Sequence, residues 1–257
     1  MSQPDLPLSI VEAMLRADTV HECWSVLERT LDGYGFDRII YGYTRFREGR
    51  NLGDEDSLLL LSNFPQDYLD AFVGRGLFKS SRMMRWAWNG DGARTWSDIA
   101  AEIHDPTEAE REVAEFNRSR GVEAGVTMAF PSAWRRSKGV AALTARHGLT
   151  QDDVDALWSC EGRAVEALCR LAHRLIVTLP ADGIGPRLTD RQREVLEWVG
   201  DGKAVADVAL VMGLSVPTVE KHLRLARANL GAETTAQAVL KAQALGRIYR
   251  MKLDEPG

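Results

Sequence analysis

The segment 216–230, near the C-terminus, has the residue types and the spacing to contact DNA. Its apolar residues recur every three or four positions, which predicts an amphipathic helix over 216–230. They are Val219, Leu223, Ala226 and Leu230. On the opposite face, Arg224 could bind a guanine edge and Glu220 could accept from a cytosine amino group. Cations suited to phosphates are Lys203, Lys221 and Arg227. The pattern therefore predicts a helix that enters the major groove.

Three further helices would position this reading helix. Thr189 followed three residues later by Gln192 matches a capping box and predicts the start of the first helix. A second helix is expected over 203–212, and a fourth over 235–245, each with an apolar face. Together they predict an all-α, four-helix helix-turn-helix domain.

The turn before the reading helix also has suitable residues. Gly213 lies where the chain must reverse between two helices, a position that commonly needs positive φ. Ser215 can cap the reading helix, and Pro217 is tolerated because N–H groups of the first turn have no intrahelical partner. Both residues thus favour a helix start here.

Charge supports a DNA partner. The segment 203–252 holds eight Lys and Arg against three Asp and Glu, in a chain whose net charge is −5. A basic module on an acidic body suits local contact with phosphates. The alternative is a small helical interaction domain with an ordinary solvated basic face.

The same region resembles the DNA-binding domain of LuxR-type transcription factors. The resemblance rests on Leu188-Thr-x-Arg-x-x-Glu-Val-Leu, Thr218-Val-x-x-His-Leu, Leu230-Gly-Ala and Thr235-Ala-Gln-Ala. It implies sequence-specific binding of double-stranded DNA, with RNA polymerase as a further partner. The expected DNA-binding residues are Lys203, Ser215, Pro217, Thr218, Glu220, Lys221, Arg224 and Arg227.

Length and composition define the rest of the chain. Its 257 residues suffice for one mid-sized domain and a small C-terminal one. The Pro- and Gly-rich segment 178–186 is predicted to be a linker between a sensor domain, 1–177, and the DNA-binding domain, 187–257. Three unpatterned cysteines, no signal peptide and no membrane-length apolar run predict a cytoplasmic protein that has no contact with a membrane.

The N-terminal region alternates helical and strand-like patterns. Amphipathic helices are expected within 8–34, over 105–119 and from Thr150 to Val177, with the start of a helix at 67–72 and an apolar stretch at 83–88. Strand-like segments are 38–46, 57–64, 125–131 and 139–146, the last two paired across a turn at 132–138. These patterns predict an α/β sandwich, a central antiparallel sheet flanked by helices.

Residues 8–177 resemble the autoinducer-binding domain of quorum-sensing LuxR-type regulators. The anchors are Asn63-Phe64-Pro65, Tyr68-x-x-x-Phe72, Trp88, Trp96, Gly125-Val-Thr-Met and Gly139-Val-Ala-Ala-Leu-Thr. In that family an acyl-homoserine lactone lies between sheet and helices, enclosed by aromatic rings. The resemblance implies these ligand-binding positions: Phe64, Tyr68, Phe72, Ser81, Trp88, Trp96, Ala142 and Thr144.

Several of these positions depart from the family pattern. The usual Asp that accepts the ligand amide N–H falls at Ser81, the following Pro at Arg82, and the Trp that donates to the lactone at Tyr68. Two usual tyrosines fall at Phe64 and Phe72. A strand serine falls at Ala142, although Thr144 remains. Loss of one partner from a buried polar pair costs about 1–3 kcal/mol, so these changes disfavour the ordinary lactone.

Three interpretations of the sensor domain follow. It binds a small amphipathic signal, either an altered acyl-homoserine lactone or another molecule. Alternatively, it serves only dimerisation and protein interaction, with its aromatic residues filling its own core. The third interpretation, an enzyme, lacks a pattern: the five histidines are scattered, and no nucleophile elbow, phosphate loop or metal-ligand spacing occurs. No catalytic residue, cofactor or metal is therefore predicted.

A homodimer is also expected. The helix from Thr150 to Val177 has more apolar residues than one face needs, so a second apolar strip could pair with another copy. Two reading helices about one turn of DNA apart would recognise a pseudo-palindromic operator.

Overall fold

The structure is a computed structural model that describes residues 7–44, 58–131, 137–179 and 188–249. Its contacts divide the chain between Val177 and Thr178 into two compact units. Most of the predicted turn at 132–138, namely residues 132–136, lies outside the described residues, as does most of the predicted linker, residues 180–186. Each unit is described by itself.

The first unit is built on a five-stranded antiparallel sheet, ordered β2-β1-β5-β4-β3. The strands are β1 (Phe36–Thr44), β2 (Leu59–Ser62), β3 (Gly92–Thr95), β4 (Gly125–Phe130) and β5 (Lys138–Ala145). All six residues of β4 are buried, as expected of a strand covered on both faces. The predicted α/β sandwich is confirmed.

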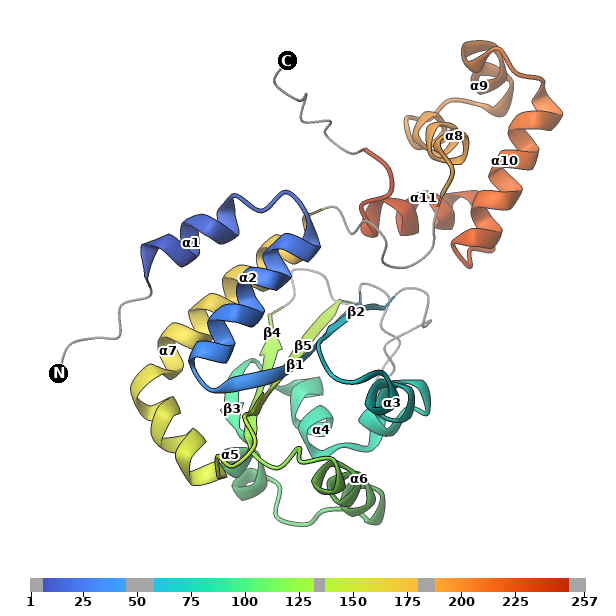
Figure 1. Cartoon of the computed structure of the whole chain (residues 1–257). Coiled ribbons are helices and arrows are strands. Elements are labelled where there is room, and N and C mark those ends of the chain that lie inside the picture. The colour runs from blue at the N-terminus through green and yellow to red at the C-terminus, as the bar shows by residue number, and fades with distance from the viewer. Residues whose placement is uncertain (1–6, 45–57, 132–136, 180–187, 250–257) are drawn as a thin grey trace. The chain divides into compact units, whose positions relative to one another are not determined.

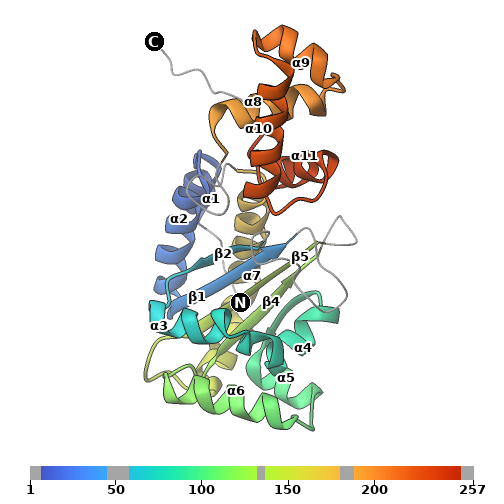
Figure 2. The ribbon, with the colours of Figure 1, turned by 90° about the vertical axis from the view of Figure 1, so that its right-hand side faces the viewer.

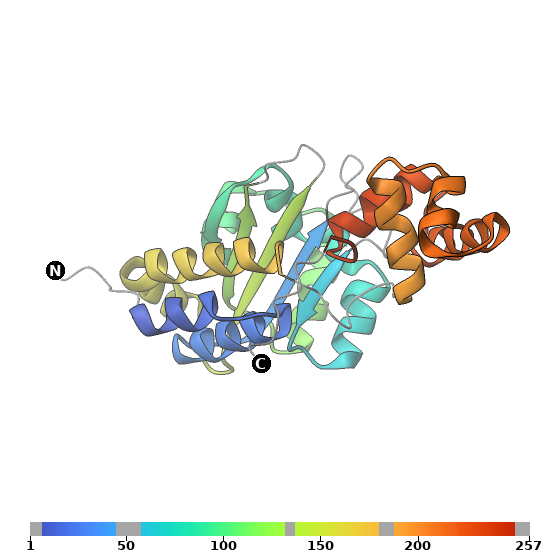
Figure 3. The same ribbon diagram turned by 90° about the horizontal axis from the view of Figure 1, so that it is seen from above.

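Helices cover both faces of this sheet (Figures 1 and 2). One layer consists of α1 (Leu8–Leu15), α2 (Val20–Gly33) and α7 (Gln151–Ile176), which run side by side in Figure 3. The opposite layer consists of α3 (Gln66–Leu69), α4 (Arg82–Asn89), α5 (Trp96–Glu102) and α6 (Glu108–Ser119). A short π-helix, Asp70–Gly74, and a 3₁₀ helix, Leu77–Ser80, join α3 to α4.

Side-chain caps fix several helix starts. Thr150 and Asp153 form a reciprocal capping box at α7, and Thr107 and Glu110 form another at α6. The predicted helix over 105–119 therefore begins later, at Glu108, because Thr107 takes the extended cap conformation. The expected pattern also omitted β3 and α5, whose boundary residue Thr95 ends one and caps the other.

One buried polar cluster lies in the layer of α2 and α7. His173 on α7 forms a 2.8 Å hydrogen bond between its Nδ1 and the Tyr41 hydroxyl, and its ring stacks on Phe130 with centroids 4.4 Å apart. Burial, followed by the nearby Arg174 and Arg170 charges, lowers the pKa of His173 to about 4. The imidazole is therefore a neutral part of the core at physiological pH.

The described residues of the second unit form four helices. They are α8 (Asp190–Gly200), α9 (Val205–Met212), α10 (Val216–Asn229) and α11 (Thr235–Ala244). The predicted capping box of Thr189 and Gln192 is present, Gly213 has φ of +64°, and Ser215 caps α10 by accepting from the Thr218 N–H. The four-helix architecture is confirmed, with α9 beginning two residues later than expected.

Candidate functional site

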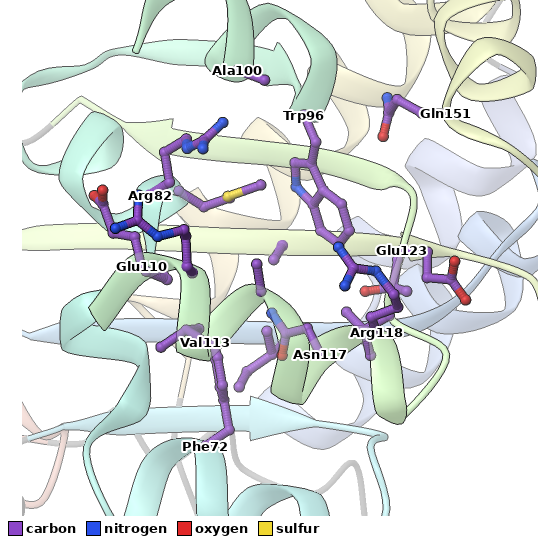
Figure 4. Close-up of a pocket in the computed structure, with 18 of the residues that line it drawn as sticks. Phe72, Arg82, Trp96, Ala100, Glu110, Val113, Asn117, Arg118, Glu123 and Gln151 are labelled. Atoms are coloured by element: carbon purple, nitrogen blue, oxygen red, sulfur yellow. The ribbon is translucent and has the colours of Figure 1, made fainter. Parts of the chain in front are cut away.

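A cavity of about 490 Å³ lies in the first unit between the sheet and the layer of α4, α5 and α6 (Figure 4). Seven of the eight predicted ligand positions line it. They are Phe64, Tyr68, Phe72, Ser81, Trp96, Ala142 and Thr144. The eighth, Trp88, packs instead in an apolar cluster with Met84, Ile99 and Ala129.

Aromatic rings form one wall of this cavity. Tyr68 stacks between Phe64, at a centroid distance of 4.4 Å, and Phe72, at 5.2 Å. Its hydroxyl donates to Oδ1 of Asn117 on α6 over 3.0 Å. Burial raises the pKa of Tyr68 above its ordinary value, so the phenol stays protonated. The stack is a rigid apolar surface with its one hydroxyl already paired.

The other predicted polar positions differ in their partners. The Trp96 indole N–H donates to the Thr127 hydroxyl over 2.9 Å. Ser81 is the N-cap of α4 and accepts from the Met84 N–H over 3.1 Å. Thr144 is only 1% exposed, and its hydroxyl has no hydrogen-bond partner among the described residues. Its polar group therefore remains available to a bound molecule.

Charged side chains surround one part of the cavity. Glu110 is 6% exposed, receives the Thr107 N–H over 2.8 Å, and forms an ion pair with Arg85 over 2.8 Å. Arg82 is half buried and forms no ion pair or hydrogen bond with any described residue. The buried Glu110 carboxylate is thus neutralised by Arg85, whereas the Arg82 guanidinium has no ion-pair partner among the described residues.

Sequence reasoning missed the contribution of α6. Its lining residues Glu110, Val113, Ala114 and Asn117 have the i, i+3, i+4, i+7 spacing of one helix face. The spacing was visible, but a face containing Glu and Asn does not stand out as buried.

A smaller apolar hollow of about 90 Å³ adjoins the main cavity. The two share Ile40, Phe72, Ser81, Met83 and Ala142. Its other walls are mostly aliphatic and aromatic: Gly42, Leu58, Leu60, Val73, Phe78, Met84, Thr127 and Val140. The combined space can therefore take a molecule with one polar end and one apolar end.

The second unit exposes a polar surface on α10. The predicted apolar stripe is buried, with Val219 and Ala226 at 0%, Leu230 at 1% and Leu223 at 6% exposure. A shallow hollow over the opposite face is lined by Val205, Pro217, Glu220, Lys221, Leu223, Arg224, Arg227 and Thr235. Lys203 and Ser215 are exposed beside it, and Thr218 is half buried. The Ser215 and Thr218 hydroxyls lie 2.8 Å apart, within the helix cap.

Two cations of this unit face inward. Lys241 is 3% exposed and donates from Nζ to the carbonyls of Leu230 and Gly231 over 3.2 and 2.7 Å. It thereby satisfies carbonyls at the C-terminal end of α10. Arg247 is 5% exposed. Neither belongs to the exposed surface of α10.

The described part of the chain holds neither a cluster of metal-binding side chains nor a membrane-spanning helix. There, no three His, Cys, Asp or Glu side chains lie close enough to hold a metal ion. No helix within the described residues is both long enough and apolar enough to cross a membrane.

Comparison with known proteins identifies both units. Residues 19–176 match the model of the autoinducer binding domain, and 186–242 match that of bacterial regulatory proteins of the luxR family. The transcriptional activator protein SolR of Ralstonia solanacearum is 31% identical over 255 residues, covering 92% of this chain and 96% of SolR. The quorum sensing-dependent regulator RpaR of Rhodopseudomonas palustris is 26% identical, covering 77% and 78%.

The fold has a solved counterpart. The crystal structure of Escherichia coli SdiA aligns with a TM-score of 0.50 at 18% identity, covering 95% of this chain and 98% of SdiA. The family consists of transcription regulators that bind DNA and autoinducer-type ligands, rather than enzymes. This chain belongs to the LuxR family of transcriptional regulators and carries an autoinducer-binding domain.

Proposed function

We propose that this regulator is a homodimer whose binding to a pseudo-palindromic operator is controlled by a small amphipathic signal in the 490 Å³ cavity. The cavity is the observation that carries the proposal. A domain that serves only dimerisation would fill this space with its own side chains. Here the aromatic stack and Trp96 instead surround an open volume within the range of small-molecule sites.

The ligand-binding role is assigned to the seven lining positions named above, and not to Trp88. The aromatic wall supplies apolar contact area, whereas Ser81 and Thr144 supply hydroxyls. Ala142 lies at the junction of the two hollows, where a larger side chain would occupy ligand space.

The DNA-reading role is assigned to the exposed face of α10. Arg224 would read a guanine edge and Glu220 a cytosine amino group, whereas Lys203, Lys221 and Arg227 would hold phosphates. Ser215, Pro217 and Thr218 would lie at the helix end closest to the duplex. Bound at a promoter, such a dimer would be placed to contact RNA polymerase.

Dimerisation is assigned to α7. Val165 and Leu168 are fully buried against the chain's own core, whereas Leu157, Leu171 and Leu175 are only half buried. This second strip is the surface proposed to pair with another copy. Sedimentation of a monomer at micromolar concentration would contradict this assignment.

The proposed control is a linkage between signal binding and the dimer-competent fold. A signal at a hundredfold excess over its Kd stabilises the form that binds it by about 2.7 kcal/mol. That gain would raise the fraction of protein able to occupy its operator.

The test uses full-length protein purified without signal and a duplex selected from random DNA. Affinity is measured by fluorescence anisotropy with and without an organic extract of the source culture. The extract is expected to tighten binding to the wild type but not to Ala142→Phe, which fills the cavity junction. Equal affinity of the wild type in both conditions would favour the ligand-independent alternative.

A further inference from the structure

Arg82 is an arginine of the cavity wall that forms no ion pair with any described residue. Arg82 is the first residue of α4, lines the cavity, and has no ion pair or hydrogen bond with any described residue (Figure 4). Neighbouring arginines are engaged: Arg85 with Glu110, and Arg118 with Glu115. Arg82 is therefore a half-buried positive charge beside an open space.

The position of Arg82 adds to this positive potential. The N-terminal end of a helix carries partial positive charge and favours an anion. α4 has no acidic residue in its first turn, and Arg82 places a second positive source at the same end. This arrangement is unfavourable in the unliganded protein and becomes favourable when an anion binds.

The other polar groups around the cavity are mainly donors. Ser81 accepts the Met84 N–H, so its own O–H remains to donate. Asn117 uses Oδ1 for the Tyr68 hydroxyl, which leaves its amide N–H groups. The unpartnered Thr144 hydroxyl is 1% exposed and lines the same cavity.

The one deeply buried carboxylate of the lining is already occupied. Glu110 accepts from the Thr107 N–H and pairs with Arg85. An amide N–H entering the cavity would therefore meet no free buried carboxylate among the described lining residues. An acceptor group, in contrast, would meet the Ser81 hydroxyl and the Arg82 guanidinium.

We infer that the signal is an amphipathic carboxylate. Its anion is held by Arg82, Ser81 and the N-terminal end of α4, and its apolar tail enters the 90 Å³ hollow that begins at Ser81 and Phe72. This inference rests on the proposed function, since it names the chemistry of the molecule that the cavity binds.

The test compares three probes with the same ten-carbon acyl chain: decanoate, decanamide and N-decanoyl-homoserine lactone. Binding to full-length protein is measured by isothermal titration calorimetry. Decanoate is expected to bind more tightly than either neutral probe. Arg82→Met should weaken decanoate binding about tenfold to hundredfold, the effect of losing a charge-assisted hydrogen bond, and leave decanamide binding nearly unchanged.

Two further variants separate charge from folding. Arg82→Lys retains the cation and should recover much of the affinity for decanoate. Arg75→Met removes an exposed arginine outside the cavity lining and should change nothing. The melting temperature of unliganded Arg82→Met should equal or exceed that of the wild type, because the substitution removes a cation from a helix N-terminal end.

The outcomes distinguish this inference from the proposed function. Tighter binding of the lactone or the amide would overturn the carboxylate and leave a signal-binding cavity intact. Full decanoate affinity in Arg82→Met would also overturn it. If no probe binds and the culture extract leaves DNA affinity unchanged, both the inference and the signal-controlled function fail.

Discussion

Gly125 permits a close approach to strand β5 and to the Trp96 ring of the cavity lining, and Gly125→Ala tests that packing directly. A β-carbon at this position would lie 2.2 Å from the Leu143 carbonyl oxygen and 2.9 Å from the Trp96 ring. The carbonyl belongs to the neighbouring strand β5, so relief requires either a strand shift or displacement of the indole. Displacement of Trp96 would also break its 2.9 Å bond to Thr127.

The expected cost follows from these two events. Overpacking a close-packed core costs about 1–3 kcal/mol, and a lost hydrogen bond adds about 1 kcal/mol. Gly125→Ala is therefore expected to lower the free energy of unfolding of the sensor domain by about 2–4 kcal/mol. Urea unfolding followed by tryptophan fluorescence and near-ultraviolet circular dichroism measures the change.

A matched control makes the same substitution where space is open. Gly33 is the exposed last residue of α2, and nothing lies within 4 Å of an added β-carbon. Gly33→Ala is expected to leave stability unchanged or raise it by up to about 1 kcal/mol, because alanine is the better helix former. If the free energy of unfolding of Gly125→Ala lies within about 0.5 kcal/mol of the wild-type value, the close packing at Gly125 does not carry the expected cost.

Three other predictions concern the core, the cavity wall and the DNA surface. The folded pKa of His173, about 4, lies below its ordinary value of 6.5, so the unfolded state takes up the proton first as pH falls. The free energy of unfolding, measured in urea titrations, should thus fall by about 3 kcal/mol between pH 6.5 and 4. In the His173→Phe variant it should fall less over the same pH range. Tyr68→Phe should lower the free energy of unfolding by about 1 kcal/mol, because Asn117 loses its hydrogen-bond donor. An unchanged free energy of unfolding would contradict a stabilising role of that hydrogen bond. Arg224→Ala should remove sequence preference in competition binding, whereas Lys221→Ala should weaken all duplexes alike. An intact preference in Arg224→Ala would disprove the groove placement.

The helix starts and the turn of the DNA-binding domain could be predicted almost completely from the sequence. Thr189, Gly213 and Ser215 act through the backbone of their immediate neighbours, so residue type and spacing determine their structure. The four-residue β3 had no such signal, because it is held by pairing with β4 rather than by its own periodicity.

The cavity was predictable in part. The aromatic positions from Phe64 to Phe72 follow helical spacing, and they form one stacked wall. Trp88 shares their residue type but packs elsewhere, since a tryptophan in an amphipathic helix carries no mark that separates a cavity wall from a core. The hydrogen bond from Tyr68 to Asn117 joins residues that are 49 positions apart in the sequence. Residue types and local spacing do not show which distant segments come together.

The burial of Lys241 changes how the basic C-terminal segment should respond to ionic strength. Its ammonium group donates hydrogen bonds to the carbonyls at the end of α10, and Arg247 is also buried. Neither cation is therefore exposed to displace counterions from the duplex. Among the described residues from 203 onward, the cations assigned to phosphates are Lys203, Lys221 and Arg227, because Arg224 is assigned to a base edge. Each neutralised phosphate contributes about −0.9 to the slope of log K against log salt, so these three contribute about −2.7 per protomer.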